Sequence, residues 1–267
     1  MIFIIILLLL LIYFKYQNLK KKEQFYTKDN NYGIHTEYLN IYDDFYSFLY
    51  DKIYFNKENY LKFANIVIQY SNSVYNNNLF IGIKTGGHIN EILKNNIQSK
   101  SISKSESVIK VCNNNYPTNN YSINKDYDTN PYTFSDNEFT HISIIDNELY
   151  YLKDIRSILY NCNKWLIHKG YLFIQVYNDL NSLKNGFFIV NDNIYNYDYE
   201  YEIKKTNHNN LRIVETIYNK KNKRINHHVI TYHDNEHIKH TAKDFDLKYK
   251  EIIPINNYES ILIFQKL

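Results

Sequence analysis

Residues 77–94 read NNLFIGIKTGGHINEILK, a short apolar run that leads through a glycine-bearing turn into an amphipathic segment. We predict a strand over residues 79–83 and a helix over residues 87–96. Glycines in such a turn let the backbone come close to a ligand, and the start of the helix offers unpaired N–H groups. The stretch therefore predicts a site for a nucleotide-like ligand at the end of a strand.

The segments that follow alternate between short apolar runs and amphipathic runs. We predict strands over residues 99–103, 120–124, 138–145 and 171–177, and helices over residues 105–113 and 154–166, the latter finished by His168, Lys169 and Gly170. Such alternation predicts an α/β fold with a doubly wound, mostly parallel sheet and ligands at the carboxyl ends of its strands. Before this core, apolar spacings of three and four over residues 41–53 and 60–70 predict two capping helices.

The pattern changes after Asp179. Residues 210–233 read as two strands joined by a basic tip, so we predict an antiparallel β insertion over residues 180–235. A helix over residues 237–245 and strands at EIIPI (251–255) and SILIFQK (260–266) are predicted to close the domain. The basic tip consists of Lys220, Lys221, Lys223 and Arg224. We predict that this tip is either a solvated turn or a contact with anionic lipid.

The amino terminus carries an unbroken apolar run, IFIIILLLLLIYF, over residues 2–14, with Lys15 and residues 20–22 supplying lysines after it. The run alone covers about 20 Å, and its extension to Leu19 nearly spans the roughly 30 Å hydrocarbon layer. No basic stretch precedes it and no small-residue cleavage site follows. We predict a transmembrane anchor over residues 1–19, a basic tether over 20–35 and a folded domain over 36–267. The lysines predict a single-pass membrane protein with a cytosolic carboxyl-terminal domain, and the alternative is a core helix or an in-plane anchor.

Charge and cysteine content narrow the function classes. The net charge of +3 among 267 residues predicts no specific nucleic-acid partner. Cys112 and Cys162 are the only cysteines, which favours a reducing compartment. A zinc site on His233, His237 and His240, with His227 and His228 nearby, is a minor hypothesis without cysteine support, and we predict no metal site.

Three blocks of sequence, in this order, resemble class I S-adenosylmethionine-dependent methyltransferases: LFIGIKTGGHINEIL (79–93), SISKSESVIKVC (101–112) and FTHISIIDNELYYLKDIRSILYNCNKWLIHKGYLFIQVYN (139–178). The resemblance covers roughly residues 37–267 and is closest to methyltransferase-like domains of large DNA viruses. It implies a seven-stranded Rossmann-like sheet, S-adenosylmethionine as cofactor and an unknown methyl acceptor. The cofactor residues that it implies are Gly82, Thr85, Gly86, Gly87, His88, Ser103 and Asp126, with Asp128 as the alternative to Asp126 on the adenine side. It also implies that Asp146 and Tyr150 position the acceptor or remove its proton.

The sequence departs from the family pattern at three positions. Phe80 replaces the acid near the end of the first strand, Lys84 replaces the central glycine, and Ser103 replaces the acid that holds the ribose. Hydrogen bonds to charged groups contribute about 1.5–3 kcal/mol each, so losing two acids predicts an affinity lower by about two factors of ten or more. Lys84 also brings a positive charge next to a cationic sulfonium. Two hypotheses follow: a membrane-anchored methyltransferase, or a degenerate, inactive fold that serves as a membrane-tethered binding or scaffold module.

Overall fold

The structure is a computed structural model that describes Tyr13 and residues 33–54, 56–71, 76–95, 97–152, 154–187, 197–205, 209–219 and 222–267. The predicted anchor over residues 1–19 lies outside the described residues except for Tyr13, and the predicted tether over residues 20–35 does so except for residues 33–35. No helix within the described ranges is both long and apolar enough to cross a membrane.

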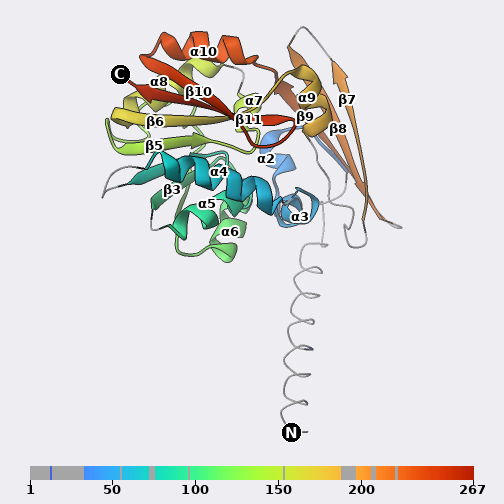
Figure 1. Cartoon of the computed structure of the whole chain (residues 1–267). Helices are drawn as coiled ribbons and strands as arrows, with labels where there is room; N and C mark the ends of the chain where they lie inside the picture. Colours follow the sequence, from blue (N-terminus) through green and yellow to red (C-terminus); the bar gives the residue numbers. More distant parts are fainter. Residues whose placement is uncertain are drawn as a thin grey trace, which may run out of the picture.

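Within the described residues, a seven-stranded sheet forms the centre of the molecule, in the order β10-β11-β6-β5-β2-β3-β4 (Figure 1). Its strands are β2 (Asn77–Ile81), β3 (Gln98–Ser103), β4 (Asn120–Ile123), β5 (Phe139–Ile144), β6 (Leu166–Tyr177), β10 (Leu247–Pro254) and β11 (Glu259–Lys266). Only β11 runs antiparallel to its neighbours β6 and β10. The chain order reverses between β2 and β5, so the carboxyl ends of these two strands flank the position where doubly wound folds bind ligands. The predicted α/β sheet is confirmed.

Helices cover both faces of this sheet because its strands are buried on both sides. On one face lie α3 (Asp44–Tyr54), α4 (Lys57–Gln69), α5 (Gly87–Leu93) and α6 (Glu106–Asn115), and on the other lie α8 (Ile155–Trp165) and α10 (Asn235–Lys243). Alternation along β2 sends Phe80 to the first face and Leu79 and Ile81 to the second. Three short helices complete the described set: α2 (Tyr38–Ile41), α7 (Glu148–Tyr151) and α9 (Leu180–Gly186).

The end of α8 differs from the prediction. The helix ends at Trp165, and residues 168–170 belong to β6. The carbonyls of Lys164 and Trp165 accept hydrogen bonds from the backbone N–H groups of Asn137 and Glu138, which ends the helix without a glycine. Lys169 adopts a left-handed φ of 63° inside the strand.

A second sheet forms the predicted insertion, in the order β1-β9-β8-β7. Its strands are β1 (Gly33–His35), β7 (Asp198–Lys205), β8 (Asn210–Tyr218) and β9 (Lys223–Thr231). The β8–β9 hairpin matches the sequence pattern, whereas β1 is drawn from the segment predicted as a tether and pairs parallel with β9. Figure 1 shows this sheet beside α3 and α7, at one end of the main sheet. An edge strand of the insertion's sheet is therefore supplied by residues that lie before the main domain in the sequence.

Candidate functional site

The turn after β2 has the backbone that the sequence predicts. Gly82 and Gly86 have φ values of +86° and +84°, which glycine adopts without strain. The space that a glycine leaves is nevertheless filled by the protein itself. A Cβ on Gly82 would lie 2.2 Å from Cβ of Glu148 and 2.7 Å from the carbonyl oxygen of Ile145. Gly82 thus permits the close approach of α7, which begins directly after β5.

Lys84, at the position of the family's central glycine, points into the protein and is 1% exposed. Its Nζ lies 3.0 Å from Oε2 of Glu148 and donates a hydrogen bond of 2.8 Å to the hydroxyl of Tyr38. The same ammonium lies 4.8, 4.4 and 5.1 Å from the ring centroids of Tyr38, Tyr42 and Tyr151, which is the arrangement of a cation–π cage. We call these five residues, together with Tyr127, the Lys84 cage.

Glu148 supplies the negative charge of the Lys84 cage and is 2% exposed. Its carboxylate accepts hydrogen bonds from Lys84, from the hydroxyl of Tyr38 at 3.0 Å and from the hydroxyl of Tyr127. Burial alone would raise the pKa of Glu148, but the attraction of Lys84 and these hydrogen bonds outweigh it and lower the pKa. Glu148 is therefore an ionised carboxylate at neutral pH. It was not among the residues predicted from the sequence, because nothing in the pattern distinguishes it from an exposed helix-start acid.

The remaining residues of the turn are covered by α3 and α4. Thr85 donates a hydrogen bond to the carboxylate of Asp51. A Cβ on Gly87 would lie 2.2 Å from Cε2 of Tyr60, and the ring of His88 packs on Tyr60 with centroids 4.2 Å apart. Thr85, Gly87 and His88 are all buried. The structure thus brings these predicted residues together, beneath side chains from the amino-terminal helices.

The predicted ribose and adenine residues lie apart from that cluster. Ser103 is 2% exposed, and its Oγ accepts a hydrogen bond of 3.2 Å from the N–H of Ser105. Asp126 is exposed, while Asp128 pairs with Lys104 at 2.7 Å. Tyr127, between the two acids, turns inward to Glu148. The loop after β4 therefore sends a tyrosine, and neither acid, into the Lys84 cage.

Asp146 borders a small polar cavity at the carboxyl ends of the central strands. The cavity has a volume of about 60 Å³ and is lined by Tyr50, Tyr54, Asn56, Asn59, Tyr60, His88, Asp146, Asn147, Gln175, Gly186, Phe187 and Glu259. Asp146 and Asn147 both have left-handed φ values, 53° and 64°. Two such residues in succession are uncommon away from glycine and mark a backbone that its surroundings hold in place. The N–H of Asp146 donates to Oε1 of Gln175 at 2.9 Å, which fixes this turn to β6.

Two further acids surround Asp146. Burial raises the pKa of Asp51 to about 6, with a further raising effect from Asp146 that the hydrogen bond from Thr85 opposes. Burial also raises the pKa of Glu259, whose oxygens accept hydrogen bonds from Gln175 and Asn256. Three acidic side chains therefore lie close together here, and Asp146 and Glu259 line the cavity itself.

Tyr150, the second predicted catalytic residue, does not line this cavity. It is fully buried, and its hydroxyl accepts a hydrogen bond of 2.8 Å from the N–H of Tyr177. Burial raises the pKa of Tyr150 far above its usual range. Tyr150 is therefore a packing residue that fixes α7 to β6.

The histidine cluster does not assemble into a metal site. In the part of the chain that the structure describes, no group of three metal-ligating side chains is placed to hold an ion. His233 and His237 stack with ring centroids 6.0 Å apart, and Nε2 of His233 is hydrogen-bonded to the carbonyl of Leu152.

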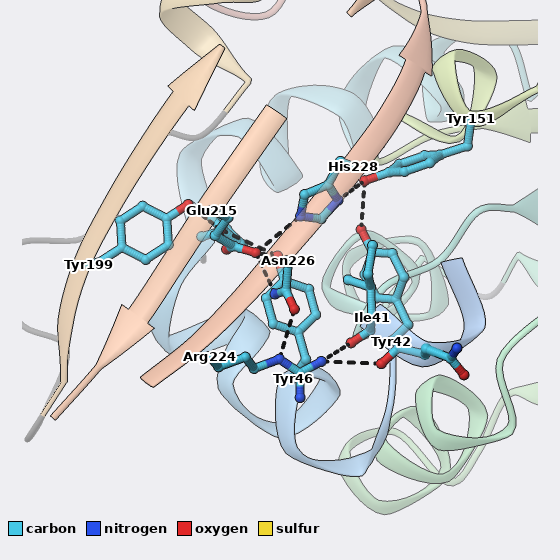
Figure 2. Close-up of polar contacts among 11 residues, drawn as sticks. Ile41, Tyr42, Tyr46, Tyr151, Tyr199, Glu215, Arg224, Asn226 and His228 are labelled. Atoms are coloured by element: carbon cyan, nitrogen blue, oxygen red, sulfur yellow. Dashed lines mark hydrogen bonds and ion pairs between the residues drawn. The ribbon is translucent and has the colours of Figure 1, made fainter. Parts of the chain in front are cut away.

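A second buried polar cluster joins the insertion to the main domain (Figure 2). The carboxylate of Glu215 on β8 accepts hydrogen bonds from Tyr46 at 2.9 Å and Asn226 at 2.7 Å, and lies 3.0 Å from Nε2 of His228. Burial by itself would raise the pKa of Glu215, but His228 and the other donors outweigh it, so the pKa is lowered. On its other side His228 lies 2.7 Å from the hydroxyl of Tyr151, a member of the Lys84 cage. The two buried clusters are therefore continuous.

Arg224 corrects the expectation of an exposed basic tip. Its side chain is fully buried and pairs with Asp43 at 2.7 Å. It also donates to the carbonyls of Asn40 and Ile41 at 3.2 and 2.8 Å, as Figure 2 shows for Ile41. Arg224 thus fixes β9 to the segment around α2 and takes no part in a surface patch.

Comparisons with known proteins identify the fold. No family model and no curated protein sequence matches this chain. Among solved structures, a S-adenosylmethionine-dependent methyltransferase from Clostridium acetobutylicum matches with a TM-score of 0.65 at 13% identity, over 83% of this chain and 97% of that one. SAM-bound CalS10, an amino pentose methyltransferase from Micromonospora echinaspora, matches with a TM-score of 0.59 at 11% identity, over 79% and 91% of the two chains. The sugar N-methyltransferase KedS8 from a Streptoalloteichus species gives 0.58 at 8% identity, over 79% and 88%. The chain therefore has the Rossmann-like fold of class I S-adenosylmethionine-dependent methyltransferases.

At the positions that the resemblance assigns to the cofactor, the residues present do not fit S-adenosylmethionine. The space beside Gly82 holds Glu148, and the central position of the turn holds an inward-pointing Lys84. Phe80 is a core residue that packs against Phe63, with ring centroids 6.4 Å apart. Ser103 offers one hydroxyl where two charge-assisted acceptors are needed. A cationic sulfonium would have to displace a cation that already has its counter-ion and its aromatic rings.

Proposed function

We propose that this chain is a degenerate, catalytically inactive methyltransferase fold that serves as a membrane-tethered binding module. The observation that carries the proposal is the buried ion pair of Lys84 and Glu148 at the cofactor turn, at 3.0 Å between side chains that are 1% and 2% exposed. Breaking a buried pair by removing one partner costs about 3–5 kcal/mol. A cofactor that must separate this pair would lose a comparable amount of binding free energy.

The Lys84 cage also explains how the fold tolerates the loss of a cofactor. An ammonium held by aromatic rings and a carboxylate offers the same chemistry as a bound organic cation. Lys84 therefore supplies from within the chain the positive charge that the cofactor's sulfonium would bring. The competing function, methyl transfer to an unknown acceptor, is favoured by the fold likeness to methyltransferases such as SAM-bound CalS10.

Calorimetric titration of the full-length chain with S-adenosylmethionine separates the two functions. We expect no binding heat at about 1 mM cofactor for the natural chain, since even a weak site would give a signal near that concentration. The combined variant Lys84→Gly, Glu148→Ala and Ser103→Asp restores space and a ribose acceptor, and we expect it to gain measurable affinity. Saturable binding by the natural chain would disprove the inactive reading.

A matched control uses a lysine–glutamate pair whose lysine is exposed and whose glutamate side chain is 11% exposed. Lys94 and Glu91 lie 2.7 Å apart, and the lysine side chain is 56% exposed. The variant Lys94→Gly, Glu91→Ala removes the same residue types near the same turn without opening the Lys84 cage. We expect it to bind no more cofactor than the natural chain.

The membrane tether rests on the sequence of residues 1–19 and is proposed together with the binding role. Membrane fractionation followed by alkaline carbonate extraction tests it. We expect the full-length chain to stay with the membrane and a variant that lacks residues 2–19 to be released. The sequon at Asn120 reports the side, because a cytosolic domain carries no glycan there.

A further inference from the structure

The cavity beside Asp146 holds a carboxylate that lacks a good partner. Within the described residues, this carboxylate accepts one long hydrogen bond of 3.4 Å, from the N–H of Lys84, and lies 3.6 Å from Nδ1 of His88. Both distances exceed those of well-formed hydrogen bonds. The Asp146 side chain is only 11% exposed. A shielded carboxylate without strong donors is costly, so it attracts a positively charged group.

A second, independent feature of the cavity is the hydroxyl of Tyr50. The residue is 8% exposed and lines the cavity, and among the described residues its hydroxyl has no hydrogen-bond partner. The hydroxyl is not fully enclosed by protein atoms, so it is open to a partner in the cavity. Because the ring of Tyr50 is held by Tyr42, Tyr46 and Tyr54, the hydroxyl cannot leave the cavity without moving that aromatic cluster. It is a fixed polar group that a ligand can meet.

The cavity wall completes the chemistry. Tyr50, Tyr54, Tyr60 and Phe187 contribute aromatic rings, and rings beside a carboxylate favour organic cations over neutral molecules. Glu259 is a further acid in the wall, and its oxygens accept hydrogen bonds from Gln175 and Asn256. The opening is small: about 60 Å³ has room for about four groups of water size, at roughly 15 Å³ each. The head of an alkylammonium ion fits this space.

We infer that this cavity binds an alkylammonium group, with the carboxylate of Asp146 as counter-ion and the hydroxyl of Tyr50 as a hydrogen-bond acceptor. The inference rests on the proposed binding role and gives that role a ligand class. The group can belong to a small free amine or to the side chain of a lysine. In either case one N–H of the ammonium donates to the carboxylate of Asp146 and another donates to the hydroxyl of Tyr50.

Saturation-transfer NMR of the full-length chain with methylammonium tests the inference. We expect saturable binding with a dissociation constant on the order of 10 mM, which is what the best very small ligands reach. Methanol, a neutral molecule of similar size, should give no saturable signal. Tetraethylammonium should give none either, because it exceeds the cavity. Nα-acetyl-lysine methylamide distinguishes the two sources: tighter binding than methylammonium points to a peptide lysine, and weaker binding points to a free amine.

Three variants make the test specific. Asp146→Asn keeps the size and the left-handed backbone, which asparagine tolerates, and should weaken methylammonium binding at least about tenfold. Tyr50→Phe removes only the hydroxyl and should weaken it severalfold. Asp136→Asn, an exposed aspartate that lies 3.4 Å from Lys164, should leave binding unchanged. The fluorescence of the buried Trp165 verifies that each variant is folded.

Two results would overturn the inference: no saturable binding by the natural chain, or equal binding by the Asp146→Asn variant. Both are separable from a failure of the proposed function. The proposed function fails if the natural chain binds S-adenosylmethionine, whether or not it binds methylammonium. If neither ligand binds, the inactive fold stands and only the ammonium site is lost.

Discussion

Cβ of Glu148 lies 2.2 Å from the point that a side chain on Gly82 would occupy, and the Glu148 carboxylate ends 3.0 Å from the ammonium of Lys84. One glutamate thus fills the space over the first glycine of the turn and neutralises the residue that replaces the central one. Both contacts join the turn after β2 to α7 after β5, across the reversal in strand order where these two strands end side by side. The turn and α7 are therefore adapted to each other.

Replacing either Lys84 or Glu148 alone should destabilise the fold more than half as much as replacing both does, because each charge needs the other as its partner. We expect Lys84→Met or Glu148→Gln alone to lower the free energy of unfolding by about 3–5 kcal/mol, because each leaves one buried charge without its partner. The double variant Lys84→Met, Glu148→Gln should lose clearly less than the sum. Urea unfolding followed by Trp165 fluorescence measures this. Additive losses in the double variant would show that the two residues act independently.

Gly82 and Gly33 form a matched pair of glycine substitutions. Both have left-handed φ values, +86° and +135°, but a Cβ on Gly33 meets nothing within 4 Å. Gly33→Ala should therefore cost only the backbone strain, about 1–3 kcal/mol. Gly82→Ala adds the collision with Glu148, so it should cost at least about 1 kcal/mol more in the same unfolding experiment. Equal losses would mean that α7 moves aside freely.

Asp51 should give the domain an unusual pH dependence. Its pKa rises to about 6 in the folded state from an ordinary 3.8. An acid with a raised folded pKa favours folding while it is protonated, so this contribution is lost as the pH rises from about 4 to about 6. The loss is at most about 3 kcal/mol. Asp146, His88 and Thr85 face the same carboxyl.

The variant Asp51→Asn isolates that contribution. Its unfolding free energy, compared with that of the natural chain, should improve between about pH 4 and pH 7 by about 1–3 kcal/mol. Glu148 and Glu215 titrate in both proteins and cancel in this difference. A pH profile that Asp51→Asn leaves unchanged would contradict the assignment.

Glu215 should stabilise the insertion in the opposite pH direction. Its folded pKa lies below the ordinary value of 4.5, so its contribution is present above about pH 4.5 and is lost as the pH falls through the folded pKa. Glu215→Gln should cost about 3–5 kcal/mol near pH 7 and flatten the acid limb of the stability profile. Glu200→Gln, which changes an exposed glutamate on the neighbouring strand, should stay within about 0.5 kcal/mol of the natural chain.

The sequence predicts the main sheet well because its signal is local. Leu79, Phe80 and Ile81 are apolar on both sides of a parallel strand, and the glycines after them permit one kind of turn. The parallel pairing of β2, β3, β4, β5 and β6 follows from the same alternation of strands and helices. The resemblance to methyltransferases placed Gly82 and His88 at the end of the central strand, where the structure has them.

Which side chains fill the space at the turn after β2 could not be predicted from the sequence. Whether Lys84 turns outward or inward depends on Tyr38 and Glu148, which lie far from it in the chain. For the same reason β1 could not be predicted, since residues 33–35 become a strand only by pairing with the remote β9. Arg224 looked like part of a solvated turn because its partner Asp43 is likewise remote in sequence.

The segment around α2 holds three remote parts of the molecule at once. Tyr42 gives its ring to Lys84 and its carbonyl to the hydroxyl of Ser105, while the neighbouring carbonyl of Ile41 receives Arg224. Displacing this short segment would remove contacts from two buried cations, Lys84 and Arg224, at the same time. A single backbone cleavage near residue 40 should therefore loosen the insertion and the turn after β2 together.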